Sequence, residues 1–312
     1  MLYLIIVLVA VLTLIKAISF YISGTIIHLN RQPVPKTPEV YGMDFEPVEF
    51  KTSDGVNIKG WLIKGTSDKL VIMTHVGGLT KYGSTQNYKN LTKLYDKEIE
   101  FLKIAKHLYD KGYSVLMFDF RNHGESGPSP NKGMAAVGLE EYRDVVAAMD
   151  FIQSHQDLKD KAVGFVSFCM GANSTIIAMS KEPEVFKDVK CLIAIQPISM
   201  EVFIRTYAKK ILTPLGAALL FPFIKMFVRL RSGSRLEDMS PKEYVKDIKV
   251  PMLYVQARND PWTDFSDIQG FFDNTSEPKE FFWIEDTKHR FESYSYFQDK
   301  PEKMLEWLEK WM

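Results

Sequence analysis

The stretch SFCMG at residues 167–171 lies between an apolar run, AVGFV at 162–166, and a segment that favours a helix from Gly171 onward. A buried strand that turns sharply into a helix forms an elbow, which holds a nucleophile at a strained backbone position. The residues two places before and after the centre must be small, because larger side chains clash across the turn. Ser167 and Gly171 meet this requirement when Cys169 is the centre. The pattern therefore predicts that Cys169 is a nucleophile.

Ser167 is the alternative nucleophile in the same stretch. Centring the elbow on Ser167 would place Phe165 and Cys169 at the two crowded positions, which disfavours the serine. The helix after Cys169 directs its N-terminal amides and the positive end of its dipole at the sulfur, and both favour the thiolate. A free cysteine is in most proteins a small buried hydrophobic residue, so the other segments of the chain decide between a structural and a catalytic role.

Four further segments of the sequence each carry residues that are suited to a catalytic site. Each is an apolar strand followed by a loop that carries glycine, carboxylate or histidine residues. They are LVIMT at 70–74 ahead of HVGG at 75–78, YSVLMF at 113–118 ahead of DFRNHGES at 119–126, VPMLYVQA at 250–257 ahead of RNDP at 258–261, and EFFWI at 280–284 ahead of DTKHRF at 286–291. A hairpin at 51–61, with Asp54-Gly55 as its turn, precedes them.

With these segments, the chain from about residue 44 to the C-terminus resembles an α/β-hydrolase. The loop at 119–126 is similar to one in the esterases and lipases of this superfamily. The cysteine at the centre of the elbow resembles dienelactone hydrolases and polyhydroxyalkanoate synthases. The resemblance implies an α/β fold with a mostly parallel central sheet flanked by helices. It implies no particular substrate, because the elbow and the body are similar to different relatives.

The resemblance also assigns two backbone amides to an oxyanion hole. One aligns with Gly77, in the loop after an apolar strand, and the other is that of Met170, the residue after the nucleophile. Val76 stands where the family usually has a glycine. Asp119 and His123 belong to a loop that is structural in most members, so we expect them to form a polar network that braces the loops.

The acid and the base are expected after the nucleophile, in that order. Asp260 follows a late buried strand, where the family carries its acid, and would hold an imidazole in the required tautomer. Asp264 and Asp267 are nearby alternatives, but they fall in the helix expected to follow. His289 comes just after the last strand, where the family's general base lies. The predicted catalytic set is Cys169, Asp260 and His289.

Residues 2–15 form an apolar run, and the apolar character resumes after Lys16 and continues to Ile27. The combined length is sufficient to cross a bilayer. A cleaved signal peptide is the alternative, but the sequence lacks a positively charged leader and a convincing small-residue cleavage site. We therefore expect an uncleaved anchor. Arg31 and Lys36 follow it closely, and by the positive-inside rule they place the catalytic domain in the cytoplasm.

The sequence predicts three parts: an anchor at 1–28, a proline-containing stiff linker at 29–43 and an α/β-hydrolase domain at 44–312. Within the domain, residues 199–240 form an insertion where the family places its lid. The centre of the insertion, 211–228, is apolar enough to resemble a second membrane span, but a second crossing would separate the predicted acid and base from the nucleophile. We expect an apolar lid over an acyl pocket or at the bilayer surface, and a lid packed on its own domain is the alternative.

The composition argues against several other classes of protein. The 312 residues are 46% hydrophobic, with a formal net charge of zero and no basic run, so we expect one large core and no nucleic-acid partner. The two cysteines, Cys169 and Cys191, are expected as free thiols, because a disulfide would disable the nucleophile. The sequence shows no metal-binding or cofactor motif, and VGG at 76–78 lacks the Lys-Ser/Thr ending of a phosphate loop.

The expected function is that of a membrane-anchored hydrolase that cleaves an ester, a thioester or a lactone through a Cys169 acyl-enzyme. Its expected partners are a small-molecule or lipid acyl substrate and the membrane. Transfer of the acyl group to an acceptor other than water uses the same catalytic set and is one alternative. A catalytically inactive scaffold that binds a partner or a lipid at the membrane is the other.

Overall fold

The computed structural model describes residues 1–85, 98–131, 133–285, 287 and 289–312. Its main sheet has eight strands in the order β1-β2-β6-β3-β7-β8-β9-β10. These strands are β1 (Phe45–Lys51), β2 (Asn57–Ile63), β3 (Lys69–Thr74), β6 (Ser114–Phe118), β7 (Ala162–Phe168), β8 (Val189–Ile195), β9 (Met252–Ala257) and β10 (Lys279–Ile284). A separate two-stranded sheet pairs β4 (Gly83–Ser84) with β5 (Ile99–Glu100).

The main sheet is parallel except at one edge. β1 and β2 form the expected antiparallel hairpin, whose turn contains Gly55 with a φ of +87° that glycine adopts without strain. β2 is antiparallel to β6, and the strands from β6 to β10 in the sheet order run parallel to their neighbours. The carboxyl ends of the parallel strands therefore meet at one edge of the sheet, where α/β proteins place their sites.

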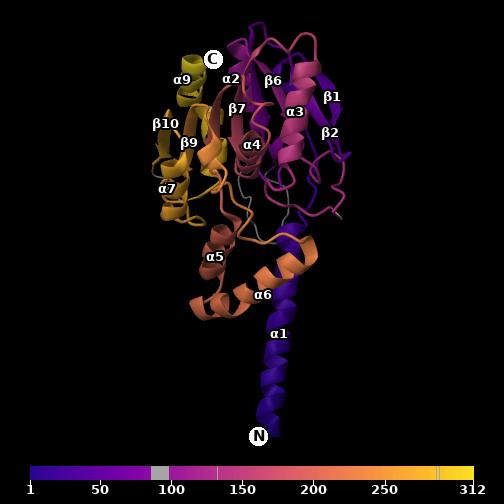
Figure 1. Cartoon of the computed structure of the whole chain (residues 1–312), viewed down its shortest axis with the longest axis vertical. Coiled ribbons are helices and arrows are strands. Elements are labelled where there is room, and N and C mark those ends of the chain that lie inside the picture. Colours follow the sequence, from indigo (N-terminus) through magenta and orange to yellow (C-terminus); the bar gives the residue numbers. More distant parts are fainter. Residues whose placement is uncertain (86–97, 132, 286, 288) are drawn as a thin grey trace.

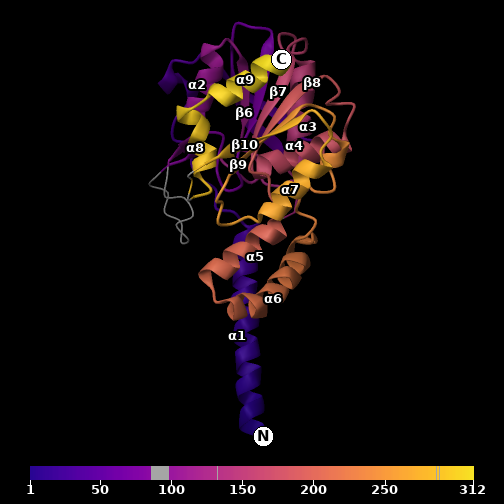
Figure 2. The ribbon, with the colours of Figure 1, turned by 90° about the vertical axis from the view of Figure 1, so that its left-hand side faces the viewer.

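Helices cover both faces of this sheet, so its central strands are apolar along their length. Every residue of β6 and β9 is buried. Figure 2 shows α2, α8 and α9 on one side of the sheet and α3, α4 and α7 on the other. Their bounds are α2 (Phe101–Asp110), α3 (Tyr142–Ser154), α4 (Met170–Lys181), α7 (Phe265–Asn274), α8 (Glu292–Asp299) and α9 (Glu302–Trp311). The sequence did not indicate α8, because its serine and tyrosine residues have weak helix propensity.

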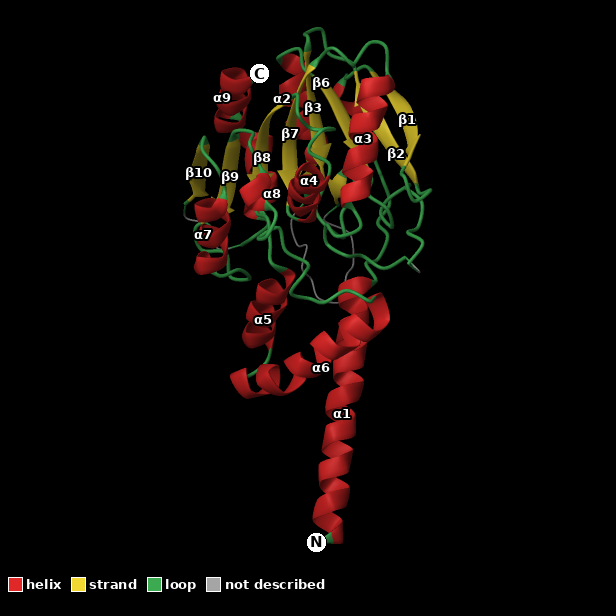
Figure 3. Ribbon diagram, viewed as in Figure 1, coloured by secondary structure: helices red, strands yellow, loops and turns green. Residues whose placement is uncertain are grey.

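Three more helices lie beyond the carboxyl edge of the sheet. α1 (Leu2–Ile27) projects from the domain, so that the N-terminus lies at the opposite end of the molecule from the C-terminus (Figure 1). α5 (Met200–Ile211) and α6 (Pro214–Ser232) form the insertion between β8 and β9 that was predicted as a lid. Figure 3 shows this pair of helices below the sheet and beside α1. By length and composition α1 is able to cross a membrane, a property it shares with signal sequences.

The segment after α1 follows the surface of the domain. Ile27 is fully buried at the end of the helix. Arg31 Nη1 donates to the carbonyl oxygen of Gly124 at 2.8 Å, and Lys36 Nζ forms an ion pair with Glu100 at 2.6 Å. The described residues also form two 3-10 turns, one at Pro38–Tyr41 in this segment and one at Val245–Asp247. These contacts attach the base of α1 to loops at the carboxyl edge of the sheet.

Candidate active site

Cys169 occupies the turn between β7 and α4, as the elbow pattern predicted. Its backbone has φ +50° and ψ −111°, a conformation that residues other than glycine rarely adopt. It directly precedes Met170, the first residue of α4, and is 7% exposed. Ser167 is fully buried in β7, where its hydroxyl lies 3.0 Å from Thr175 Oγ1. The structure therefore places Cys169, and not Ser167, at the turn.

Gly171 lies where the elbow touches the end of β3. A Cβ atom at this position would lie 2.5 Å from Thr74 Oγ1 and 2.8 Å from the carbonyl oxygens of Thr74 and His75. Non-bonded heavy atoms do not lie this close together, so the backbone would have to shift to make room for a side chain at Gly171. The need for a small residue two places after the nucleophile thus comes from contact with the neighbouring strand, which pairs in parallel with β7.

Replacing Gly171 with alanine is expected to lower the free energy of unfolding by about 1–3 kcal/mol, because the methyl group overpacks the elbow. Denaturation in urea measures this change. Gly270→Ala is a matched control, because a Cβ atom there lies 3.9 Å from its nearest neighbour and alanine favours the α7 helix. A Gly171→Ala chain as stable as the native one would show that the elbow tolerates a larger residue.

Gly77 and Met170, the two expected oxyanion donors, lie against each other. A Cβ atom at Gly77 would lie 3.2 Å from Met170 Sδ and 3.4 Å from Met170 Cβ. Because Met170 begins α4, its amide N–H has no acceptor within the helix. Leu29, in the segment after α1, packs on the same glycine, with its Cδ1 3.8 Å from that Cβ position. The N-terminus of α4, the loop after β3 and the segment after α1 therefore meet beside Cys169.

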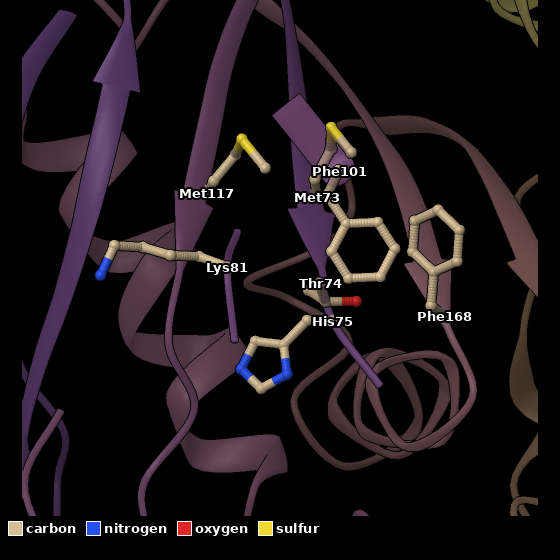
Figure 4. Close-up of a pocket in the computed structure, with 7 residues that line it drawn as sticks. All are labelled: Met73, Thr74, His75, Lys81, Phe101, Met117 and Phe168. Atoms are coloured by element: carbon tan, nitrogen blue, oxygen red, sulfur yellow. The ribbon is translucent and has the colours of Figure 1, made fainter. Parts of the chain in front are cut away.

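A buried polar network lies behind this loop. Figure 4 shows His75 and Lys81 among the mostly apolar side chains that line a small space there. Lys81 Nζ forms an ion pair with Asp119 Oδ2 at 2.6 Å, and both side chains are fully buried. His123 Nε2 accepts the Gly78 N–H at 2.9 Å. Burial, with His123 close by, lowers the pKa of His75 to about 3, so this ring is neutral. Asp119 and His123 thus contact and brace the loops, as expected.

Asp260 lies in the loop after β9, where the acid was predicted, and its carboxylate holds an arginine. Oδ2 forms an ion pair with Arg290 Nη1 and accepts the Thr263 hydroxyl at 2.8 Å. Oδ1 accepts the Trp262 N–H at 2.9 Å. Both side chains of the ion pair are 2% exposed. Each buried charge is stabilised by the other, because a buried charge without a partner loses its hydration and has no ion pair to compensate for that loss.

Arg290 connects this carboxylate to the nucleophile. Its Nη2 lies 3.8 Å from Cys169 Sγ and 2.7 Å from the carbonyl oxygen of Gln196, and its Nε donates to Tyr294 Oη at 2.7 Å. Burial raises the pKa of Tyr294, and a hydrogen bond with Cys169 acts in the same direction, so the hydroxyl keeps its proton. An N–H and an O–H donor therefore both face the sulfur, and such surroundings suit a thiolate.

His289 lies in the loop after β10, within a cluster of aromatic side chains. Its ring stands nearly perpendicular to the Trp262 ring, with 5.3 Å between the centroids. Its Nδ1 accepts the Phe291 N–H at 3.2 Å. The neighbours Asp286 and Lys288 lie outside the described residues. The indole of Trp262 thus connects His289 to the loop after β9.

The structure brings Cys169 and Asp260 together through Arg290, and it places His289 against Trp262 in the loop that carries Asp260. The sequence did not indicate Arg290 or Tyr294 as members of the site. Their one signal was position, since both follow the predicted base within five residues.

A model of the α/β-hydrolase fold family matches residues 90–287 of the chain. The chain belongs to this family. The uncharacterized protein YqkD of Bacillus subtilis is 23% identical to it over 297 residues, which cover 90% of this chain and 88% of that protein. The polyketide transferase af380 of Aspergillus fumigatus is 26% identical over 137 residues, or 44% of this chain and 41% of that protein.

Among solved structures, the Pyrococcus furiosus esterase Pf2001 matches 92% of this chain with 98% of its own, at a TM-score of 0.70 and 26% identity. This similarity and the family match confirm the fold class predicted from the sequence. The α/β-hydrolase chain thus has the mostly parallel sheet and flanking helices of an esterase-like hydrolase.

Proposed function

We propose that this α/β-hydrolase transfers an acyl group from an ester, a thioester or a lactone to water through a Cys169 acyl-enzyme. The position of the thiol carries the proposal. It stands on a strained turn at the N-terminus of α4, 3.8 Å from Arg290 Nη2 and next to the Met170 amide. The cation and the helix dipole favour the anionic sulfur, and the amide favours a developing oxyanion. The similarity to an esterase structure supports the same class of reaction.

In acylation, the Cys169 sulfur bonds to the carbonyl carbon while the π electrons of the carbonyl group move to its oxygen. The amides of Met170 and Gly77 hold this oxyanion. The thiol proton passes to His289. As the carbonyl group re-forms, the bond from its carbon to the leaving oxygen or sulfur breaks, and that atom takes the proton from His289 to become an alcohol or a thiol, which stays attached to the acyl group when the substrate is a lactone. Water attacks the acyl-enzyme next and gives a proton to His289. The bond between the carbonyl carbon and the Cys169 sulfur then breaks, and the proton returns to the sulfur as the acid is released.

We assign Asp260 two tasks in this scheme. Its ion pair with Arg290 keeps the guanidinium beside Cys169 Sγ. Its second task is the one expected from the resemblance, the orientation of the His289 imidazole during proton transfer. Trp262 donates its backbone N–H to Asp260, and its indole ring packs against the His289 ring, so the two loops lie close together.

His289→Ala is expected to slow turnover by about 10²–10⁴-fold, the usual loss when a general base is removed. Steady-state kinetics on an aryl ester that the native chain cleaves at Cys169 measure this effect. His155→Ala is the control, because His155 follows α3 and its Nε2 lies 3.9 Å from the exposed carboxylate of Glu46. Turnover of His289→Ala within about threefold of native would remove His289 from the mechanism.

Acyl transfer to an acceptor other than water is the second candidate function. Two relatives with transferase names favour it: the polyketide transferase af380 and the acyltransferase drtE of Aspergillus calidoustus, which is 24% identical over 155 residues. A panel of aryl esters and acyl thioesters, incubated with and without an alcohol or amine acceptor, separates the two functions. Free acid as the product in both cases identifies a hydrolase, and an acylated acceptor identifies a transferase.

We propose further that α1 anchors the enzyme in a membrane, with the catalytic domain on the cytoplasmic side. The apolar side chains of its first half are exposed, among them Leu2, Leu4, Leu8, Leu12 and Leu14. A bilayer would cover these side chains, which water solvates poorly. The contacts of Ile27 and Arg31 with the domain would then hold the site close to the membrane surface.

A further inference from the structure

One face of α6 presents apolar side chains to the outside of the molecule. This exposed face consists of Leu215, Leu219, Met226 and Leu230, which are 70%, 48%, 40% and 72% exposed. Steps of four, seven and four residues place them on the same side of a helix. The opposite side is buried and consists of Ala217, Leu220, Ile224 and Val228. α6 is therefore apolar on both sides, unlike a surface helix with a polar outer face.

α6 packs against the second half of α1, which continues into the exposed apolar first half of that helix. Figures 1 and 2 both show α6 beside α1, on the side of the domain away from α9. Ser19 Oγ donates to the Leu220 carbonyl oxygen at 3.2 Å, and the Phe20 and Phe227 rings meet edge to face with 5.4 Å between centroids. Arg231 Nη1 donates to the Phe20 carbonyl oxygen at 3.1 Å. Because the two helices are joined in this way, a bilayer around α1 would also meet α6.

Basic residues accompany the apolar face. From Glu201 to Glu237 the chain has seven lysine and arginine residues against these two glutamates, a net charge of +5, although the net charge of the whole protein is zero. The basic residues are Arg205, Lys209, Lys210, Lys225, Arg229, Arg231 and Arg235. Glu201 forms ion pairs with Arg205 and Lys225, and Glu237 forms ion pairs with Lys225 and Arg235. An apolar helix face combined with cations is typical of helices that lie in the interface of an anionic bilayer.

We propose that α6 lies in the interface of an anionic lipid bilayer, with its exposed face among the acyl chains. The proposal rests on the anchoring of α1 proposed above and extends it, because it gives the lid a lipid partner of its own. α5 connects this surface to the site. The Phe203 ring lies 5.6 Å from the Arg290 guanidinium, and the Tyr207 and Trp262 rings are 5.7 Å apart. The helix pair that contacts Arg290 and Trp262 through α5 would therefore also contact the membrane through α6.

Quenching by brominated lipids tests the proposal on the full-length chain. Leu219→Trp places an indole on the exposed face. The native chain is measured separately, and the emission of its five tryptophans is subtracted from that of the variant. In vesicles of phosphatidylcholine and phosphatidylglycerol, lipids brominated near the headgroup end of the acyl chain should quench the added emission at least about twofold. Leu8→Trp in α1 is the control for anchoring, and Glu309→Trp in α9 is the control for a residue outside the membrane.

The two proposals fail in different ways. Emission from Leu8→Trp that brominated lipids leave unchanged would overturn the anchoring by α1, and the placement of α6 with it. Quenching of Leu8→Trp without quenching of Leu219→Trp would overturn the placement of α6 alone. Cross-links between two copies through α6 would then assign the exposed face to a dimer. Equal quenching of Leu219→Trp in phosphatidylcholine alone would overturn the requirement for anionic lipid.

Discussion

Replacing Cys169 with alanine is expected to lower kcat/KM for acyl substrates by at least about 10³-fold, because covalent attack is no longer available. The fold should survive, since the side chain removed is small and no disulfide is lost. Kinetics on an aryl ester measure the loss. Mass spectrometry of the intact protein provides the second measurement: after brief mixing, the native chain gains the mass of the acyl group and the Cys169→Ala chain does not.

Cys191→Ala is the matched control for this experiment. Cys191 is fully buried in β8, where burial raises the pKa of its thiol to about 12, so the thiol stays protonated and unreactive near neutral pH. A thiol-directed probe should therefore modify Cys169 well before Cys191 in the folded protein, and both alike after denaturation. An active Cys169→Ala chain in which a fluorophosphonate labels Ser167 would overturn the assignment of the nucleophile.

Replacing Asp260 with alanine is expected to lower the free energy of unfolding by about 3–5 kcal/mol, the usual cost of leaving one partner of a buried ion pair alone. The unpaired partner is Arg290, whose guanidinium remains buried beside Cys169 Sγ. Turnover should fall as well, because the guanidinium loses the carboxylate that positions it. Denaturation in urea and steady-state kinetics on the same preparation measure both effects.

Two further variants show whether the ion pair is the cause. Asp264→Asn changes an alternative acid at the exposed N-cap of α7, and since asparagine also caps helices we expect a change below about 0.5 kcal/mol. Asp260→Leu combined with Arg290→Met removes both buried charges and should recover much of the lost stability, but not the activity. An Asp260→Ala chain that unfolds at the native urea concentration would show that the pair does not stabilise the site.

The parts of the fold that depend on local patterns were predictable from the sequence. Small residues on either side of Cys169 predict the elbow, and apolar strands that end in functional loops predict the order of the site segments. The family match confirms the fold class that these patterns indicated. α8 was not predicted, because its position depends on packing against α2 and β9 more than on its own residues.

The sequence by itself determined the α/β-hydrolase fold, the apolar helix α1 and the place of Cys169 at the turn, since each follows from neighbouring residues. Only the tertiary structure decided that Arg290 stands between Asp260 and Cys169. His289 and Arg290 are adjacent in the sequence, and both are able to donate a hydrogen bond to a carboxylate. The contact of Arg290 with Asp260 depends on elements far apart in the chain, because a buried guanidinium must find partners for all its N–H groups. It finds them on the loops after β8 and β9 and on α8, which meet only when the sheet has formed.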